Sequence, residues 1–153
     1  MKVCIIGCGS IGGTLARALQ GMYEVSQVML MDVHPEKAKA LESELAKARV
    51  VNHFEEALDQ ADLIVEAANQ AAAREFVPKA LEKGRSVMLL SVGAMVDDEF
   101  RGRCRVIAKQ TGAKIYIPSG AVCGIEGVGA AAQEEIEEIN LMTYKPPKAF
   151  EGV

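Results

Sequence analysis

Four glycines near the amino terminus are the first residues whose spacing suggests chemistry. The stretch GCGSIGG, residues 7–13, follows a short apolar run and precedes residues with helical spacing. Gly7, Gly9 and Gly12 give the pattern G-x-G-x-x-G, in which the first glycine permits a tight turn and the second lets the main chain approach a pyrophosphate. The third allows a helix to pack closely on a strand. Between a strand and a helix, this pattern predicts a phosphate-binding loop.

An acidic residue farther along the chain gives a second, independent indication. Asp32 lies twenty residues after Gly12, at the end of a predicted strand. A carboxylate at that position accepts hydrogen bonds from the adenine ribose hydroxyls of a dinucleotide. The alternative is a purely structural turn with an unrelated acid at a strand end. We favour a site for NAD or NADP, because the glycines, their strand–helix context and the acid agree.

Short apolar strands alternate with helix-like segments along most of the chain. Strands are predicted at residues 3–6, 25–31, 49–51, 63–65, 87–90 and 114–117. Helices are predicted at residues 10–19, 35–47, 54–58, 70–83 and 97–110, with Pro78 expected to kink the fourth. Continuous apolar strands are typical of a parallel sheet with both faces covered. The alternation indicates an α/β fold with a doubly wound parallel sheet of Rossmann type.

Composition narrows the classes of function. The chain has 153 residues, of which 25% are charged and 5% are aromatic, and a formal net charge of -4. It therefore has neither the basic excess nor the aromatic content that would indicate a nucleic-acid surface. No apolar run approaches the roughly 18 residues that span a bilayer, and the amino terminus does not resemble a signal peptide. Four cysteines without a CxxC pair favour free thiols in the cytoplasm.

Three loops of small residues follow the later strands, at residues 66–70, 91–94 and 117–124. Ligands of open α/β sheets bind at the carboxyl ends of the strands, so these loops should face one crevice. Taken singly, each is more simply explained as a short connection. Their shared location favours a role in binding.

The same stretches resemble the L-aspartate dehydrogenase family. The resemblance runs from GCGSIGG through VEAANQAA and LLSVGAMVD to YIPSGAVCGIEGVGAA and IEEINLMTYKPP, which is nearly the whole chain. The later stretches are more specific than the glycine pattern, which other nicotinamide dehydrogenases share. The resemblance implies NAD- or NADP-linked oxidation of L-aspartate to iminoaspartate, a product that leads to oxaloacetate and ammonia or to NAD biosynthesis.

The resemblance also implies roles for individual residues. Those that would hold the pyrophosphate are Gly7, Gly9, Ser10, Ile11 and Gly12, and Asp32 would bind the adenine ribose. Those that would line the path to the nicotinamide are Ala67, Ala68, Ser91, Gly93, Gly120 and Ala121. The family's catalytic histidine has no counterpart in this chain, so no catalytic residue is assigned. We expect His34 and His53 to be exposed surface residues, and the acidic run at 134–138 to be a solvated helix end rather than a metal site.

Two domains are expected. Residues 1–120 would form the dinucleotide-binding domain, and residues 121–153 the beginning of an incomplete α/β substrate and dimerisation domain, with a strand over residues 136–144. Family members are considerably longer, so this chain would be a truncated gene product, one part of a split protein or a piece of a longer one. We expect it to be weakly active or inactive alone, and to associate as a homo-oligomer or with a complementing substrate-domain chain.

Two other functions stay open at this point. A Rossmann module that senses NAD(H) without catalysis would need no substrate domain, but it would have no use for the dehydrogenase-like loop SGAVCGIEG. Another two-domain enzyme, such as a dihydrodipicolinate reductase, usually carries a histidine-rich segment after the sixth strand. This sequence has none there.

Overall fold

A computed structural model describes residues 1–119, 125–133, 135–140, 142 and 144. Contacts between Cα atoms divide the chain into two compact units, Met1–Pro118 and Ser119–Val153. None of the helices in the described part of the chain is long and apolar enough to cross a membrane.

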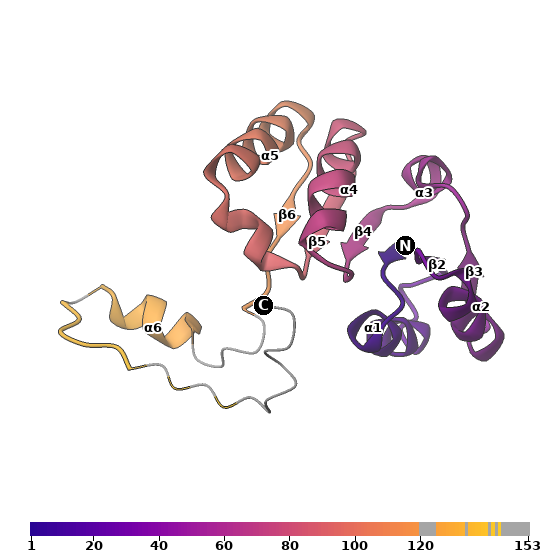
Figure 1. Cartoon of the computed structure of the whole chain (residues 1–153), viewed down its shortest axis with the longest axis horizontal. Coiled ribbons are helices and arrows are strands. Elements are labelled where there is room, and N and C mark those ends of the chain that lie inside the picture. The colour runs from indigo at the N-terminus through magenta and orange to yellow at the C-terminus, as the bar shows by residue number, and fades with distance from the viewer. Residues whose placement is uncertain (120–124, 134, 141, 143, 145–153) are drawn as a thin grey trace. The chain divides into compact units, whose positions relative to one another are not determined.

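The first unit is built on one six-stranded sheet in which every neighbouring pair of strands is parallel (Figure 1). Its strands are β1 (Lys2–Ile6), β2 (Gln27–Met31), β3 (Ala48–Val50), β4 (Leu63–Glu66), β5 (Ser86–Leu89) and β6 (Ile115–Tyr116). Their order across the sheet is β3-β2-β1-β4-β5-β6. This is the Rossmann order, in which the chain changes direction between β1 and β4 and leaves a crevice at their carboxyl ends. The predicted fold class is confirmed.

Helices pack on both faces of this sheet. They are α1 (Ser10–Gln20), α2 (Pro35–Glu44), α3 (Phe54–Gln60), α4 (Gln70–Glu82) and α5 (Asp98–Thr111), with a short 3-10 helix η1 (Val92–Val96) before α5. Because side chains alternate along a strand, Val3 and Ile5 of β1 pack in the core under α1 and α2, whereas Cys4 and Ile6 pack in the core under α3, α4 and α5. Because both faces of the central strands are buried, their sequences are continuous apolar runs.

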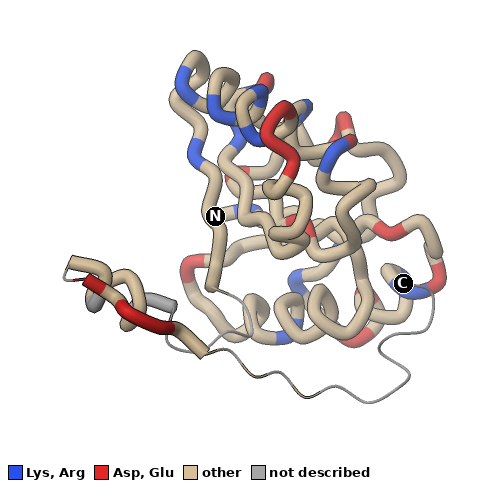
Figure 2. The backbone as a smooth tube through the Cα atoms, turned by 60° about the vertical axis from the view of Figure 1, so that its left-hand side comes forward, with Lys and Arg blue, Asp and Glu red and all other residues tan. Residues whose placement is uncertain are grey.

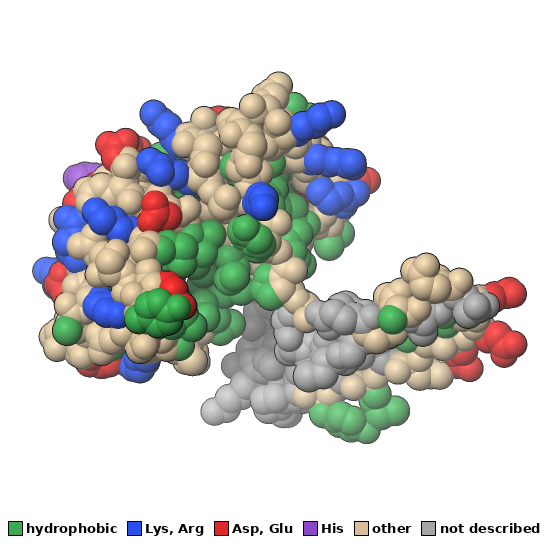
Figure 3. Space-filling model, turned by 180° about the vertical axis from the view of Figure 1, so that it is seen from behind, with side chains coloured by type: hydrophobic (Ala, Val, Ile, Leu, Met, Phe, Trp, Pro, Cys, Tyr) green, Lys and Arg blue, Asp and Glu red, His purple; other side chains and the backbone are tan. Residues whose placement is uncertain are grey.

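Charged residues of the first unit lie mainly on its helices and turns, and the strands carry few of them (Figure 2). Hydrophobic side chains also gather on one exposed face, seen from behind in Figure 3. On the β4–β6 part of the sheet, Leu63 and Met88 are half-buried and Tyr116 is 46% exposed. These three residues help to line a shallow hollow of about 300 Å³.

Some element boundaries differ from the sequence-based expectations. β2 begins at Gln27 rather than at Val25, which is buried but lies in the preceding turn, where its N–H donates to the Met22 carbonyl oxygen. α2 ends at Glu44, because Leu45 is drawn into the core and leaves the helical conformation. Pro78 lies inside α4 without ending it.

The second unit contains α6 (Ile125–Ala131), which we did not predict because its glycine-rich sequence has no apolar stripe. The strand expected over residues 136–144 is wrong for the residues that the structure describes there, which have no regular secondary structure. Its charged residues do not alternate with apolar ones, and none of the strands in the described part of the chain pairs with it. Glu135, Glu137 and Glu138 are exposed and lie after α6, not within its last turn.

Candidate cofactor-binding site

The passage from β1 into the first turn of α1 requires glycine at two positions. Gly7 has a φ of +96°, and a Cβ there would lie 2.7 Å from the carbonyl oxygen of Ala67. A Cβ on Gly12 would lie 1.8 Å from the carbonyl oxygen of Gly7. Gly7 thus allows the sharp turn and the contact with the neighbouring loop, and Gly12 allows α1 to begin close to β1.

Gly9 has a different role, because nothing lies within 4 Å of a Cβ placed on it. It is exposed, and it is the N-cap of α1 without a side-chain hydrogen bond to satisfy the first N–H groups. The open space is therefore beside free backbone donors at the positive end of a helix, where a phosphate binds well. Ser10 and Ile11 follow in the exposed first turn, with Ile11 60% exposed.

Asp32 lies one residue beyond β2 and ties the glycine loop to that strand end. Its Oδ2 accepts the Cys8 N–H at 2.6 Å, and its Oδ1 accepts the His34 N–H at 2.8 Å. A carboxylate oxygen offers two lone-pair sites, so each oxygen can accept a further hydrogen bond from a ribose hydroxyl. Burial, and then the charge of Asp32, raise the pKa of the Cys8 thiol to about 11, which keeps this thiol protonated and unreactive near neutral pH.

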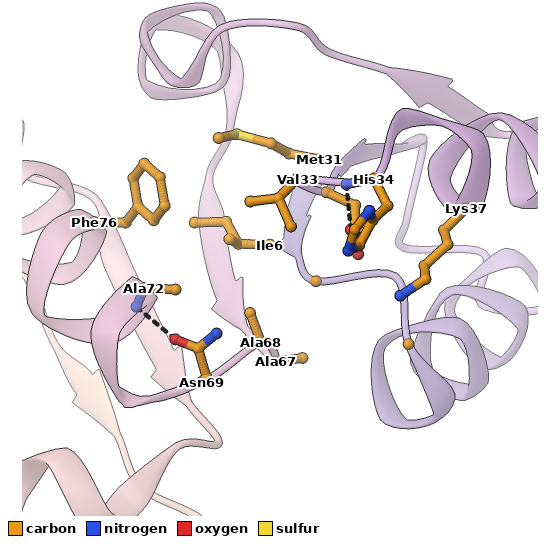
Figure 4. A pocket seen from close by; sticks show the side chains of 13 residues that line it. Ile6, Met31, Val33, His34, Lys37, Ala67, Ala68, Asn69, Ala72 and Phe76 are labelled. Carbon is orange, nitrogen blue, oxygen red and sulfur yellow. Dashed lines mark hydrogen bonds between the residues drawn. The ribbon is translucent and has the colours of Figure 1, made fainter.

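A pocket of about 300 Å³ lies where these segments meet (Figure 4). Its lining comes from the ends of β1, β2 and β4, from the loops that follow these strands, and from α2 and α4: Ile6, Gly7, Gly9, Met31, Asp32, Val33, His34, Lys37, Ala67, Ala68, Asn69, Ala72 and Phe76. Apolar side chains of Ile6, Met31 and Phe76 form one wall, and Lys37 lies beside the glycine loop opposite them. The structure thus brings five predicted residues, Gly7, Gly9, Asp32, Ala67 and Ala68, into one cavity.

The pocket residues Asn69 and Phe76 were not assigned to the site from the sequence. Lys37 follows Asp32 by five residues, and its charge can partly offset that of Asp32. The side chain of Asn69 caps α4 by accepting the Ala72 N–H at 2.9 Å. Phe76 packs edge-to-face on Phe54, with 4.8 Å between ring centroids. An asparagine immediately before a predicted helix is a capping signal, whereas nothing in the local pattern showed which face of α4 meets the crevice.

The predicted residues after β5 lie differently. Ser91 donates its N–H and its hydroxyl to the carboxylate of Glu66, and neither Ser91 nor Gly93 is among the pocket-lining residues. Gly93 lies in η1, where a Cβ would come within 2.6 Å of Nε2 of Gln70. Gly120 and Ala121 lie outside the described residues.

Both histidines are exposed, as expected. His34 lines the pocket next to Asp32, and His53 precedes α3. In the described part of the chain, no three histidine, cysteine or acidic side chains gather as they would around a metal ion.

Comparison with known proteins identifies the domain. Residues 7–118, from the glycine loop to just beyond β6, match the family model described as the NAD-binding domain of homoserine dehydrogenase. The chain belongs to this family of NAD-binding domains. NAD or NADP is therefore the cofactor, as predicted from the glycines and Asp32.

The resemblance to L-aspartate dehydrogenases is also confirmed. A protein of that name from Methanosarcina barkeri is 41% identical over 99% of this chain, and one from Methanothermobacter thermautotrophicus is 37% identical over 98%. The chain spans only 57% and 58% of the lengths of these two relatives. Among solved structures, aspartate dehydrogenase from Thermotoga maritima superposes with a TM-score of 0.65 at 24% identity, over 85% of this chain and 50% of that one, and so shares the fold.

Proposed function

We propose that the chain is the cofactor-binding part of an NAD(P)-dependent L-aspartate dehydrogenase, which oxidises L-aspartate to iminoaspartate on the way to oxaloacetate and ammonia or to NAD biosynthesis. The name of the substrate comes from the relatives. The observation that carries the proposal in this chain is the pocket in which open space beside Gly9 meets the carboxylate of Asp32.

The residues present fit a nicotinamide dinucleotide. Backbone N–H groups at the start of α1 would hold the pyrophosphate, and Asp32 would accept hydrogen bonds from the adenine ribose. Ala67 and Ala68 have small side chains, so a flat ring could approach the backbone of the loop after β4. When bound, the nicotinamide supplies the hydride-accepting chemistry. This chain's own residues bind and orient the cofactor.

On this proposal, the chemistry on the amino acid needs groups from a substrate domain. A general base must take the proton from the amine, and cations must hold two carboxylates. Residues 1–120 would bind the cofactor, with Gly120 and Ala121 on the path to the nicotinamide, and residues 121–153 would begin the substrate domain. The base alone contributes about 10² to 10⁴ in rate, so we expect the 153-residue chain to be weakly active or inactive by itself.

The proposed partners are a small-molecule substrate and either a second copy of the chain or a separate substrate-domain chain. The apolar hollow on the β4–β6 face supports association, because Tyr116 and Ile117 are 46% and 50% exposed there or next to it. Sedimentation at high concentration should show more than a monomer. A clean monomer would contradict the homo-oligomer.

The decisive assay follows NADH formation from L-aspartate by the 153-residue chain. One arm contains the chain alone, and another adds the remaining part of the Methanosarcina barkeri relative as a separate polypeptide. Activity that appears only in the second arm supports the proposal. Strong activity of the chain alone would show that its catalytic base lies within it. Tight NADH binding without turnover in either arm would favour an NAD(H)-sensing module.

A further inference from the structure

Glu66, the last residue of β4, carries the one charged side chain that is completely buried in the described part of the molecule. Burying a carboxylate is costly unless hydrogen bonds replace its water. No site residue predicted from the sequence explains why a glutamate should end this strand, between an apolar run and a loop of alanines. Its contacts show what it does.

Four donors converge on the carboxylate. Oε1 accepts the N–H of Ala68 at 2.8 Å, the N–H of Asn69 at 3.1 Å and the hydroxyl of Ser91 at 3.0 Å. Oε2 accepts the N–H of Ser91 at 3.1 Å. The main-chain oxygen of Glu66 also accepts the N–H of Leu90 at 2.9 Å. A carboxylate accepts at both oxygens, whereas a glutamine would present an amide donor at one of them.

These bonds join two loops that are distant in the sequence. Ala68 and Asn69 lie in the β4–α4 loop, and Ser91 lies between β5 and η1, immediately before η1. The β4–α4 loop is also the surface on which the glycine loop rests, since a Cβ on Gly7 would lie 2.8 Å from Cα of Ala68. The carboxylate of Glu66 therefore sets the spacing of the backbone segments on one side of the crevice.

The strand order shows which half of the cofactor that side receives. Asp32, at the end of β2, would bind the adenine ribose, and the start of α1 would bind the pyrophosphate. β4 and β5 lie on the other side of β1. The rest of the dinucleotide must extend over their carboxyl ends.

We propose that Glu66 is a positioning residue for the nicotinamide half of the site: its carboxylate holds the β4–α4 and β5–η1 loops at the separation that the nicotinamide ribose and ring require. This inference rests on the proposed cofactor site. It deepens that proposal by assigning the nicotinamide side to a residue that need not touch the cofactor.

The change Glu66→Gln separates positioning from general packing. The amide oxygen can replace Oε1 and keep its three donors, and the amide nitrogen then faces the Ser91 N–H, which is also a donor. The β4–α4 loop keeps its bonds to residue 66, whereas Ser91 loses its N–H bond and keeps only the bond from its hydroxyl, so the β5–η1 segment is held more loosely. We expect the affinity for NADH to fall about tenfold and the affinity for AMP, which occupies the adenine side alone, to change less than about twofold.

Two further variants complete the experiment. Ser91→Ala removes the hydroxyl donor and keeps the N–H bond, so it should weaken NADH binding in the same direction by about threefold. Glu99→Gln makes the same chemical change on an exposed residue in the first turn of α5 and serves as the control. Each protein is titrated with NADH, followed by its fluorescence, and with AMP by calorimetry, and its thermal unfolding is recorded.

A selective loss of NADH affinity in Glu66→Gln and, more weakly, in Ser91→Ala supports the inference. Equal losses for NADH and AMP together with a lower melting temperature would overturn it, because they would show a structural role only. Wild-type affinities in both variants would also overturn it. If Glu66→Gln does not fold, an unchanged NADH affinity in Ser91→Ala overturns it. A wild-type chain that binds neither ligand would reject the cofactor site itself, and the inference with it.

Discussion

At the scale of single residues, the three glycines of the G-x-G-x-x-G stretch have different roles. Two of them are required by the packing of the chain itself, because a Cβ on Gly7 or Gly12 would lie less than 3 Å from backbone atoms. Gly9 has open space instead. The fold would therefore tolerate a side chain at Gly9, but that side chain would fill the space that a phosphate needs.

We expect Gly9→Val to fold normally and to lose at least about a hundredfold in NADH affinity, roughly 2.7 kcal/mol, because its side chain fills the space beside the α1 donors. NADH titration with thermal unfolding as a fold check measures this. Gly102→Val is the matched control. A Cβ on Gly102, which lies in α5, also meets nothing within 4 Å, and this residue is far from the glycine loop in the chain. Normal binding by Gly9→Val would place the phosphate site elsewhere.

Two charged residues of the pocket should set the choice between NAD and NADP. The carboxylate of Asp32 repels a 2′-phosphate, and the ammonium of Lys37, which lines the same pocket, offsets part of that repulsion. We expect about a tenfold preference for NAD, or roughly 1.4 kcal/mol. Asp32→Ala should reduce the preference and Lys37→Ala should widen it. Equal affinities for the two cofactors in wild type and Asp32→Ala would refute this account.

At the scale of elements, β1 and the loop after it carry two buried thiols under opposite helical layers. Burial, and next the neighbouring Cys8, raise the pKa of Cys4 from 9.0 to about 12, and the pKa of Cys8 rises from 9.0 to about 11. Above pH 9 the unfolded chain releases these protons and the folded chain retains them. The stabilisation that both thiols give below pH 9 is therefore lost as the pH rises through 9 toward 11 and 12.

Urea unfolding should show this loss. Between pH 9 and 11 each thiol should lower the free energy of unfolding by up to about 1.4 kcal/mol per pH unit. Cys4→Ala should be less stable at pH 7, because it leaves a cavity, and should lose less stability with rising pH than wild type. A pH slope identical in the two proteins would mean that Cys4 ionises freely in the folded chain.

At the scale of the whole molecule, the core belongs to the first unit. Every buried hydrophobic residue found in the described part of the chain lies between Val3 and Cys104, and the chain divides after Pro118. The unit Met1–Pro118 therefore contains both core clusters and the pocket. Its folding should not depend on the residues that follow.

We expect residues 1–118 alone to unfold cooperatively in urea, within about 1 kcal/mol of the 153-residue chain, and to keep its affinity for AMP. Their affinity for NADH should be weaker, because the cut removes Gly120 and Ala121, which we propose on the path to the nicotinamide. Titration of both proteins with both ligands tests this. Equal NADH affinities would remove these two residues from the site, and a non-cooperative transition would show that the second unit supports the first.

The sequence by itself determined the features that depend on local physics. Three such features can each be recognised from a few neighbouring residues: a glycine that must adopt a positive φ, an acid at a strand end, and apolar runs of strand length. The fold class, the pocket residues Gly7, Gly9 and Asp32, and the exposure of both histidines were predictable in this way, whereas Ala67 and Ala68 were assigned through the family resemblance. The resemblance of the later loops then narrowed the family.

Only the tertiary structure decided the features that depend on which segments meet. The predicted strand over residues 136–144 had a suitable composition but no ladder partner among the described residues, and a strand is stable only when its backbone groups are paired. The hydrogen bonds from Ser91 to the buried carboxylate of Glu66 join two loops that lie 25 residues apart in the chain. Phe76 and Lys37 reach the pocket through the packing of α4 and α2 on the sheet. Such contacts join residues far apart in the chain, so they cannot be predicted from the pattern of neighbouring residues.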